Sequence, residues 1–295
     1  MIAVIPHAAT AQCARPNDCG MVSSGLPVSR HVKNAEVFIG RGQYEQAISY
    51  LNSIIGSLQK RRFRDHAGLF YARGRAFHAI QKLNAALSDL NEALKLDPAL
   101  NGVHEDRCWL HNDLGERDRA ISDCTIAIKL DKHNPYAYYS RARAFESLQK
   151  YDEALKDYSS AISLSSAPIG YFVHSRGSLY TQLGEHSQAI ADFSKAIEAE
   201  PKDAGYFLSR AWAHFKSGNP EAGLPDTIRA VELRPNDPVT LNSRGHFLSA
   251  LGKREDAARD FSTALSLDPN QQESREALQR LQETLDQPRS SRAQQ

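Results

Sequence analysis

Hydrophobic residues recur along most of this chain in pairs of runs with helical spacing. Within a run the apolar positions fall three or four residues apart, which places them on one face of an α-helix. A short turn separates the two runs of a pair, and in four pairs it carries Gly115, Gly184, Gly218 or Gly252. The pattern nowhere changes to the two-residue alternation of a half-buried β-strand. The sequence therefore predicts an all-α fold built from antiparallel helical hairpins.

The hairpins repeat with a fixed period. The run that begins at Ala93 returns at Ala127, Ala161, Ala196, Ala230 and Ala264, with spacings of 34, 34, 35, 34 and 34 residues. A column of small residues keeps the same register, at Ala86, Ala120, Ala154, Ala189, Gly223 and Ala257. Two columns of charged residues do so as well: Arg73, Arg107, Arg141, Arg176, Arg210 and Arg244, and Asp89, Asp123, Asp157, Asp192, Asp226 and Asp260. Four columns in register indicate a repeat protein.

The period, the small residues, the aromatic residues Phe77, Phe145 and Tyr180 beside them, and a closing proline resemble the tetratricopeptide repeat. The resemblance covers residues 28–271 and implies about seven helix-turn-helix repeats that stack into a right-handed superhelical solenoid. Residues 272–287 carry leucines on one face and are predicted to form a capping helix. Residues 288–295 are predicted to be a disordered tail.

The sixth repeat departs from this pattern at two positions. Gly223 replaces the usual alanine, and Pro225 falls inside the second helix of the repeat. Proline removes a backbone donor and crowds the preceding turn. We therefore expect a kink or a late start in this helix.

The arginine and aspartate columns are interpreted as structural ion pairs. Arg73 lies eight residues before the centre of its turn and Asp89 about eight residues after it, so both fall at one level of the hairpin. The alternative is a pair between Asp89 and Arg107 of the next repeat. Such repeated pairs favour one register more than they add net stability. We expect at least four of the six arginines to lie within ion-pair distance of an aspartate.

Residues 1–27 precede the repeats and are predicted to be a largely disordered leader. Residues 1–5 are apolar, and Ala9-Thr10-Ala11 matches the small residues that signal peptidase accepts, although no basic region precedes them. One interpretation is the remnant of an export signal, which implies a periplasmic or secreted protein. The other is a simple disordered terminus of a cytoplasmic protein.

The four cysteines bear on the same question. Cys13 and Cys19 lie close together in the leader, where a disulfide is reasonable only in an exported chain. Cys108 and Cys124 fall at about the same level of the third repeat, so a disulfide there is compatible with the predicted hairpin. The alternative for this second pair is two small buried thiols.

Composition excludes several classes of function. The 36 basic and 35 acidic residues are interleaved and leave a net charge of +1, which disfavours nucleic acid as a partner. No run approaches the roughly 20 apolar residues of a membrane-spanning helix. The chain also lacks the short motifs of metalloproteases, serine hydrolases and phosphate-binding loops. We therefore expect no catalytic residue, no cofactor, no metal site and no enzyme activity.

The resemblance implies that the binding surface is the concave face, formed by the first helix of each repeat. The residues expected there are Tyr71, Arg75, Trp109, Tyr136, Tyr139, Arg143, Tyr171, His174, Trp212, Phe215 and His246. Tyrosine, tryptophan and arginine are the types that dominate binding energy at interfaces. The alternative for Trp109 and Trp212 is that they pack between neighbouring repeats. Tyr139→Ala is expected to weaken binding and to leave the fold largely intact.

The function that follows is a non-catalytic scaffold for protein–protein interaction, with a peptide or protein segment in the groove. Some proteins of the family bind chaperone tails through a clamp of lysine, asparagine and arginine, and the matching positions here lack it. Two alternatives stay open. One is a helical-repeat protein that binds single-stranded RNA, and the other is an accessory subunit of an enzyme complex.

Overall fold

The computed structural model describes residues 27–58, 64–166 and 169–286. These residues form fifteen α-helices, one short 3-10 turn and no β-strand, which confirms the all-α repeat fold. The helices are α1 (Val28–Gly40), α2 (Tyr44–Ser57), α3 (Ala67–Ala79), α4 (Leu83–Leu96), α5 (Val103–Asp113), α6 (Arg117–Leu130), α7 (Pro135–Ser147), α8 (Tyr151–Leu164), α9 (Gly170–Gln182), α10 (His186–Ala199), α11 (Ala204–Lys216), α12 (Pro220–Leu233), α13 (Pro238–Ala250), α14 (Arg254–Leu267) and α15 (Gln272–Asp286). Most of the predicted leader, including Cys13 and Cys19, and the predicted tail lie outside the described residues.

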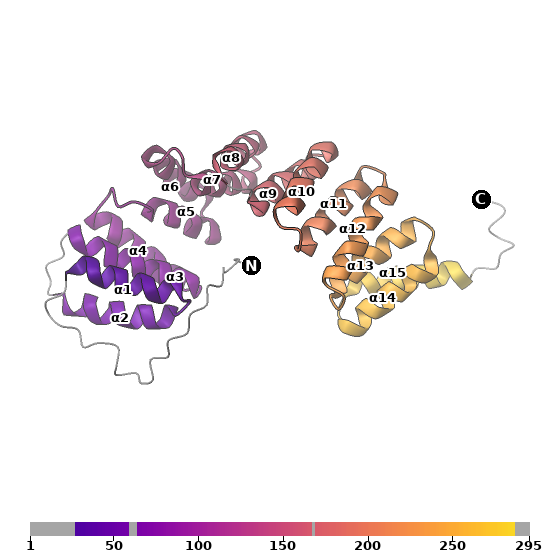
Figure 1. Cartoon of the computed structure of the whole chain (residues 1–295), viewed down its shortest axis with the longest axis horizontal. Coiled ribbons are helices and arrows are strands. Elements are labelled where there is room, and N and C mark those ends of the chain that lie inside the picture. Colours follow the sequence, from indigo (N-terminus) through magenta and orange to yellow (C-terminus); the bar gives the residue numbers. More distant parts are fainter. Residues whose placement is uncertain (1–26, 59–63, 167–168, 287–295) are drawn as a thin grey trace. The chain divides into compact units, whose positions relative to one another are not determined.

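The chain divides into two compact units, one up to Leu114 and one from Gly115 onward. In the first unit, α1 with α2 and α3 with α4 form hairpins whose apolar faces make its core (Figure 1). Leu51 and Ile54 of α2 pack with Leu69 of α3, so the first and second repeats share buried surface. The sequence period therefore appears directly as stacked hairpins.

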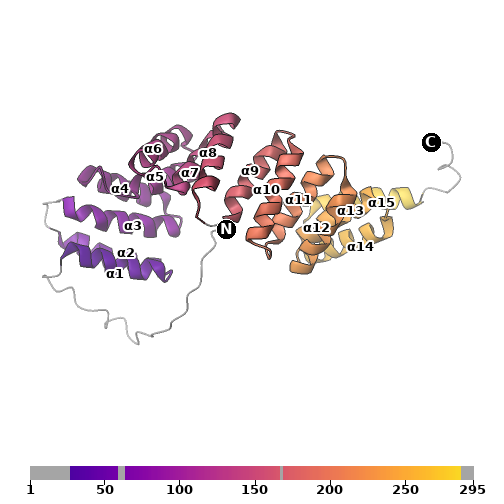
Figure 2. The ribbon, with the colours of Figure 1, turned by 45° about the horizontal axis from the view of Figure 1, so that its top comes forward.

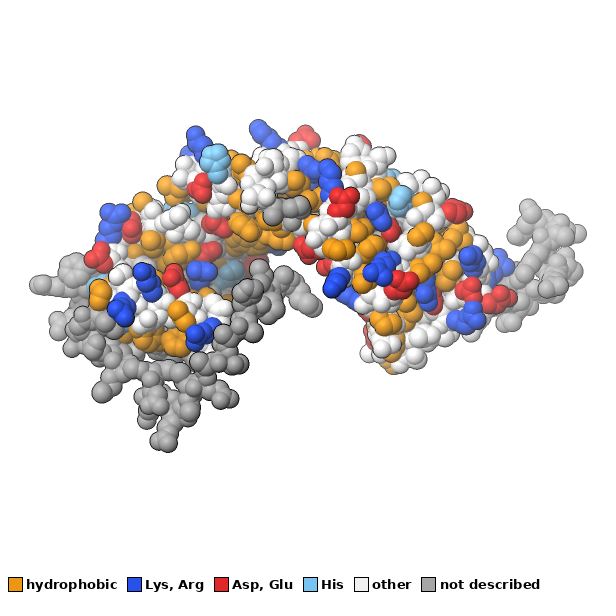
Figure 3. All heavy atoms as spheres, viewed as in Figure 1, with side chains coloured by type: hydrophobic (Ala, Val, Ile, Leu, Met, Phe, Trp, Pro, Cys, Tyr) orange, Lys and Arg blue, Asp and Glu red, His pale blue; other side chains and the backbone are white. Residues whose placement is uncertain are grey.

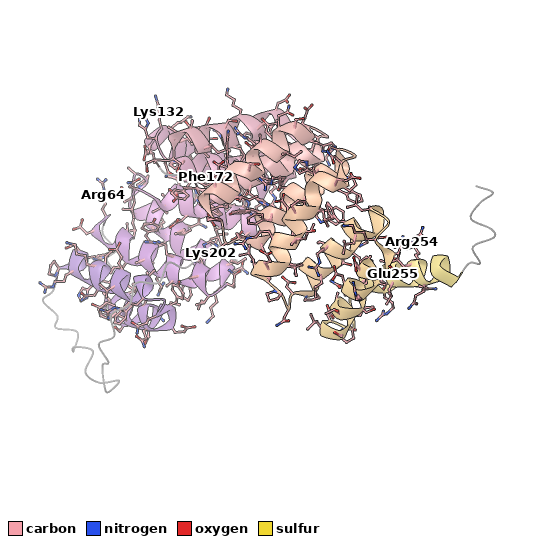
Figure 4. The ribbon with its side chains drawn as sticks, turned by 45° about the vertical axis from the view of Figure 1, so that its right-hand side comes forward. Arg64, Lys132, Phe172, Lys202, Arg254 and Glu255 are labelled. Carbon is pink, nitrogen blue, oxygen red and sulfur yellow. The ribbon has the colours of Figure 1, made fainter. Side chains whose placement is uncertain are left out.

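In the second unit, helices α7 to α14 form four consecutive hairpins. Figures 1 and 2 both show α9 to α14 side by side in the order of the sequence. Each hairpin has a first helix of 13 residues and a second of 14. Figure 4 marks the inter-repeat turns by Lys132, just before α7, and by Lys202, just before α11.

Three first helices of this unit, α7, α11 and α13, begin at residues whose side chains cap them. The side chain of Asn134 accepts a hydrogen bond from the Tyr136 amide at 3.0 Å, and that of Asp237 accepts one from the Val239 amide at 2.8 Å. A proline follows each of these caps, at a position where the missing amide hydrogen costs nothing. These short motifs set where α7 and α13 start, and hence which residues of each helix share a face.

The two helices of a hairpin approach so closely that small residues are needed on both of their facing sides. A Cβ atom added at Gly177 would lie 2.9 Å from the Phe193 ring, nearer than real Cβ contacts. In the sixth repeat the requirement falls on Gly223, where an added Cβ would lie 2.8 Å from the carbonyl oxygen of Ala211 and 2.5 Å from Phe247. The glycine at 223 therefore permits a close approach of α12 to α11.

The expectation of a late start at Pro225 is wrong. Helix α12 begins at Pro220 and continues through Pro225 to Leu233. The side chain of Asn219 accepts a hydrogen bond from the Ala222 amide at 3.1 Å and so fixes the start of the helix. Pro225 and Glu221, whose carbonyl loses its helical donor, are both exposed, so water can satisfy that carbonyl.

Helix α15 covers the apolar end of the last repeat. Ala277 and Leu281 are buried against Leu248 of α13 and Phe261 of α14. A solenoid whose terminal repeat exposed this face would present an apolar surface to water. Helix α15 therefore shields this apolar face of α13 and α14 from water.

Arginine–aspartate pairs link the two helices of five repeats. Each pair has two nearly parallel hydrogen bonds of 2.6–2.9 Å from the guanidinium to the carboxylate. The pairs are Arg73 with Asp89, Arg141 with Asp157, Arg176 with Asp192, Arg210 with Asp226, and Arg244 with Asp260. All five join residues of one repeat, which is the first of the two pairings considered from the sequence.

Four of these arginines, Arg73, Arg141, Arg176 and Arg210, also donate to a side chain of the preceding repeat. Nη1 of Arg176 donates to the Ser159 hydroxyl at 2.8 Å, and Nη1 of Arg210 donates to the Ser194 hydroxyl at 3.0 Å. The hydroxyl of Ser159 donates in turn to a carbonyl of its own helix, so its lone pairs are directed to the arginine. The guanidinium groups of Arg176 and Arg210 therefore link the two helices of their own hairpin and also fix its register on the preceding hairpin.

Candidate binding surface

The residues predicted for the groove occupy different environments on the first helices. Tyr136 and Tyr171, near the starts of α7 and α9, are 42% and 36% exposed. Most of the others are half-buried: Tyr71, Trp109, Arg143, His174, Trp212, Phe215 and His246, whereas Arg75 is exposed. Tyr139 is only 8% exposed. The face is thus partly accessible, but not at every predicted position.

Tyr139 is buried, so it does not lie on an open groove surface, and its contacts argue against the expectation that its loss would spare the fold. Its ring stacks on Phe172 with centroids 4.9 Å apart and meets Tyr171 edge to face at 5.1 Å. Its hydroxyl lies 3.1 Å from the Ser175 hydroxyl. These contacts belong to α9, so Tyr139 joins the fourth repeat to the fifth. A helical wheel of α7 alone cannot show which residues the next repeat covers.

Trp212 combines the two interpretations that the sequence left open. Its ring packs against Phe215 of its own helix and against Phe247 of α13, with centroids 5.2 and 5.3 Å apart. His246 lies beside it at 6.0 Å. Trp212 therefore fills the contact between the sixth and seventh repeats, while its half-buried position leaves part of the ring in reach of a ligand.

In the first unit, the predicted residues Tyr71 and Arg75 engage α5. The Arg75 guanidinium lies over the Tyr71 ring at 5.7 Å, and its Nε is 3.5 Å from Oδ2 of Asp106. Burial, reinforced by the charge of Asp106, raises the pKa of Tyr71. His78, one turn further along α3, lies 2.8 Å from Asp113. This part of the face is therefore linked by polar contacts between successive first helices.

His174 makes the corresponding link in the second unit. Its Nε2 lies 2.9 Å from the Ser209 hydroxyl of α11, and its ring packs against Phe193 and Tyr206. Burial lowers the pKa of His174, although the nearby Asp203 opposes that effect. The ring is therefore neutral at pH 7 and acts as a hydrogen-bonding group rather than as a cation.

A pocket of about 460 Å³ opens between α7 and α9. Its walls are Arg143, Glu146 and Ser147 of α7, Tyr158 of α8, and His174, Ser175, Ser178 and Gln182 of α9. The sequence prediction included Arg143 and His174 but missed Glu146 and Tyr158. A signal was present in the repeat alignment, because Ser178 is small where the equivalent positions hold Arg75, Trp109, Arg143, Trp212 and His246.

Two residues that line this pocket, Tyr158 and Glu146, are joined by a hydrogen bond. The hydroxyl of Tyr158, whose side chain is almost fully buried, donates to Oε2 of Glu146 at 2.5 Å. Burial and the negative charge of Glu146 both raise the pKa of Tyr158, so this hydroxyl stays protonated. Glu146 is therefore held in place with its second oxygen available to a ligand.

Metal-binding clusters and membrane-spanning helices are both absent from the described part of the chain. Residues 27–58, 64–166 and 169–286 contain no group of three histidine, cysteine or acidic side chains placed to hold a metal ion. Over the same residues, no helix is long and apolar enough to cross a membrane. On the face of the second unit shown in Figure 3, acidic and basic side chains are interspersed. The candidate binding surface can therefore contact a ligand through its shape, its aromatic rings and its hydrogen-bonding groups.

Models of the tetratricopeptide repeat match most of the chain. One matches residues 135–166, a second matches residues 32–101 and 174–238, and a third matches residues 240–271. Among solved structures, a tetratricopeptide repeat protein from Parabacteroides merdae is 20% identical, with a TM-score of 0.63 over 88% of this chain and 100% of that one. YrrB, described as a tetratricopeptide repeat protein with an unusual peptide-binding site, is 18% identical, with a TM-score of 0.53 over 64% of this chain and 96% of that one. At these identities the likeness shows the fold.

Two curated relatives match shorter stretches. DnaJ homolog subfamily C member 3 of Bos taurus is 33% identical over 72 residues, which is 24% of this chain and 14% of the relative. The tetratricopeptide repeat and J domain-containing co-chaperone DNJ1 of Fusarium oxysporum f. sp. lycopersici is 28% identical over 119 residues, which is 40% of this chain and 21% of the relative. The chain thus spans a small part of the length of both relatives.

Proposed function

Because this chain belongs to the tetratricopeptide repeat family, we propose that it is a non-catalytic scaffold that binds a peptide or protein segment along its first helices. The observation that carries the proposal is the pocket between α7 and α9, which lies on the predicted binding face. Half-buried Trp212, Phe215 and His246 extend the same face over α11 and α13. Aromatic rings of this kind bury much area at little cost in side-chain entropy.

The comparisons support a protein partner rather than another class of ligand. YrrB is described by its peptide-binding site, and the fungal relative is named a co-chaperone. On the face of the second unit shown in Figure 3, the charges are interspersed and form no continuous basic track of the kind that binds single-stranded RNA. Binding of a polypeptide is therefore favoured over binding of RNA, and a scaffold over an enzyme.

Selection from a random peptide library on the full chain tests this proposal. We expect selected peptides to lose at least about tenfold in affinity for Ser178→Leu, because the larger side chain fills the pocket and displaces the ligand. Ser187→Leu is the matched control, since Ser187 is exposed on α10 of the same repeat. Calorimetric titration of each variant measures the effect. The absence of binders, or equal affinity of both variants for every binder, would contradict the proposed groove.

We further propose that the chain functions in an oxidising compartment, periplasmic or extracellular. Cys108 and Cys124 are both fully buried and both disulfide-bonded, and such bonds persist mainly outside the cytosol. The export signal considered in the sequence lies outside the described residues. The proposal thus depends on the cysteines.

A thiol analysis of protein purified from its own host tests this placement. After denaturation without reductant and treatment with iodoacetamide, we expect the peptides that contain Cys108 and Cys124 to carry no label. The same peptides should be labelled once a reductant has been added. Labelling of both cysteines before reduction would contradict the proposal, because two buried thiols become accessible on denaturation.

A further inference from the structure

A small residue, Ser178, lines the pocket between α7 and α9. At the column of Ser178, repeats two, three, four, six and seven place an arginine, a tryptophan or a histidine. The serine leaves the wall of the pocket open, and the pocket has a volume of about 460 Å³. A ligand side chain can therefore enter the pocket.

Two residues of this column show what its side chains contact, in both cases on the following first helix. In the second repeat, Arg75 reaches the carboxylate of Asp106 on the next first helix and lies over the Tyr71 ring. In the sixth repeat, Trp212 packs on the ring of Phe247. Arg75 thus contacts a carboxylate, whereas Trp212 contacts an aromatic ring. The walls around Ser178 therefore decide which kind of side chain fits there.

Those walls are rich in hydrogen-bond acceptors. Ser147 donates its hydroxyl hydrogen to a backbone carbonyl, and Gln182 donates from its amide nitrogen to Tyr151, so their oxygens can accept from a ligand. Glu146 is held by Tyr158 through one oxygen. A guanidinium has five donors and no acceptor, which suits such a lining.

We propose that this pocket receives an arginine side chain of the bound peptide, with Glu146 as its carboxylate partner. The inference rests on the proposed peptide-binding function and names the residue that the peptide contributes. Arg143 lies on the same wall, one turn before Glu146, and its charge opposes a second cation. The guanidinium is therefore directed away from Arg143, toward Glu146 and Gln182.

A pair of small probes tests the chemistry directly. N-acetyl-arginine amide and its citrulline counterpart have nearly the same shape, but citrulline carries no charge. Titration of each probe into the full chain, labelled with ¹⁵N, is expected to shift the amide signals of Glu146 and Ser178. Citrulline should bind at least about tenfold more weakly, since a hydrogen bond to a charged group is worth more than a neutral one. Glu146→Gln, which keeps an acceptor for Tyr158, should remove the difference between the probes.

A substitution within the chain gives a readout that needs no ligand. Ser178→Arg places a guanidinium on the wall of the pocket that also contains Glu146, so the two side chains should form an ion pair. We expect the melting temperature of this variant to exceed that of Ser178→Met, a control of similar bulk without charge, by about 2 °C. In the Glu146→Gln background this difference should disappear, and Ser178→Arg should also block the arginine probe.

The outcomes separate this inference from the proposed function. Equal affinity for the two probes, or a preference for arginine that survives Glu146→Gln, would overturn the inference. Library peptides that lose affinity for Ser178→Leu but contain no enriched arginine would overturn it as well, while leaving the peptide-binding scaffold supported. Binding of the arginine probe at Glu146 without any library binder would instead support the pocket and contradict the scaffold.

Discussion

Replacing Tyr139 by alanine is expected to lower the free energy of unfolding by about 3 kcal/mol, because truncation of a buried aromatic side chain leaves a cavity. Tyr139 is 8% exposed, and its ring contacts Phe172 and Tyr171 of the next repeat. Loss of the ring thus removes packing between two repeats as well as within one. Urea unfolding followed by circular dichroism measures the change, with the slope of the transition checked for constancy.

Two further substitutions serve as controls for Tyr139→Ala. Tyr136→Ala, three residues earlier in the same helix, should cost less than about 1 kcal/mol because Tyr136 is 42% exposed. Tyr139→Phe keeps the ring and removes only the hydroxyl next to Ser175, which should cost about 1 kcal/mol. If Tyr139→Ala is no more destabilising than Tyr136→Ala, Tyr139 is not part of the core.

Replacing Asp192 by alanine is expected to destabilise the fold by about 3 kcal/mol or more, because it leaves the Arg176 guanidinium buried without its carboxylate. Asp192 is 3% exposed, and its carboxylate accepts hydrogen bonds from Nε and Nη2 of Arg176 at 2.7 and 2.8 Å. Desolvation of the guanidinium is then no longer offset by attraction. Equilibrium unfolding of the single variant measures the loss.

The double variant Arg176→Met with Asp192→Leu tests whether the fold needs the charges of this pair or only the volume of its side chains. Replacement of both partners by apolar residues should recover most of the stability, because a buried pair contributes little beyond its apolar equivalent. Arg229→Ala is the surface control. The exposed pair of Arg229 and Glu232 has a distance of 2.8 Å, yet its loss should cost less than about 1 kcal/mol. A double variant as unstable as Asp192→Ala would show that this pair is needed for more than volume.

The period and the columns of the sequence were sufficient for the repeat fold and for the ion pairs. The arginine at 176 and the aspartate at 192 lie at equal distances from one turn, so a helical hairpin alone brings them to the same level. The expected partners of Arg73, Arg141, Arg176, Arg210 and Arg244 are all in place. Such features depend on contacts within one hairpin, and the geometry of two antiparallel helices follows from local spacing.

The candidate site depends on contacts between hairpins, and there the local pattern was insufficient. Tyr139 and Arg143 lie one turn apart on the same side of α7, yet the neighbouring α9 buries the first and leaves the second at the pocket. Tyr158 lies on a second helix, and only packing of α8 against α7 carries its hydroxyl to Glu146. The sequence of one helix determines which of its faces is apolar. How closely the next repeat approaches decides which residues of that face remain exposed to solvent.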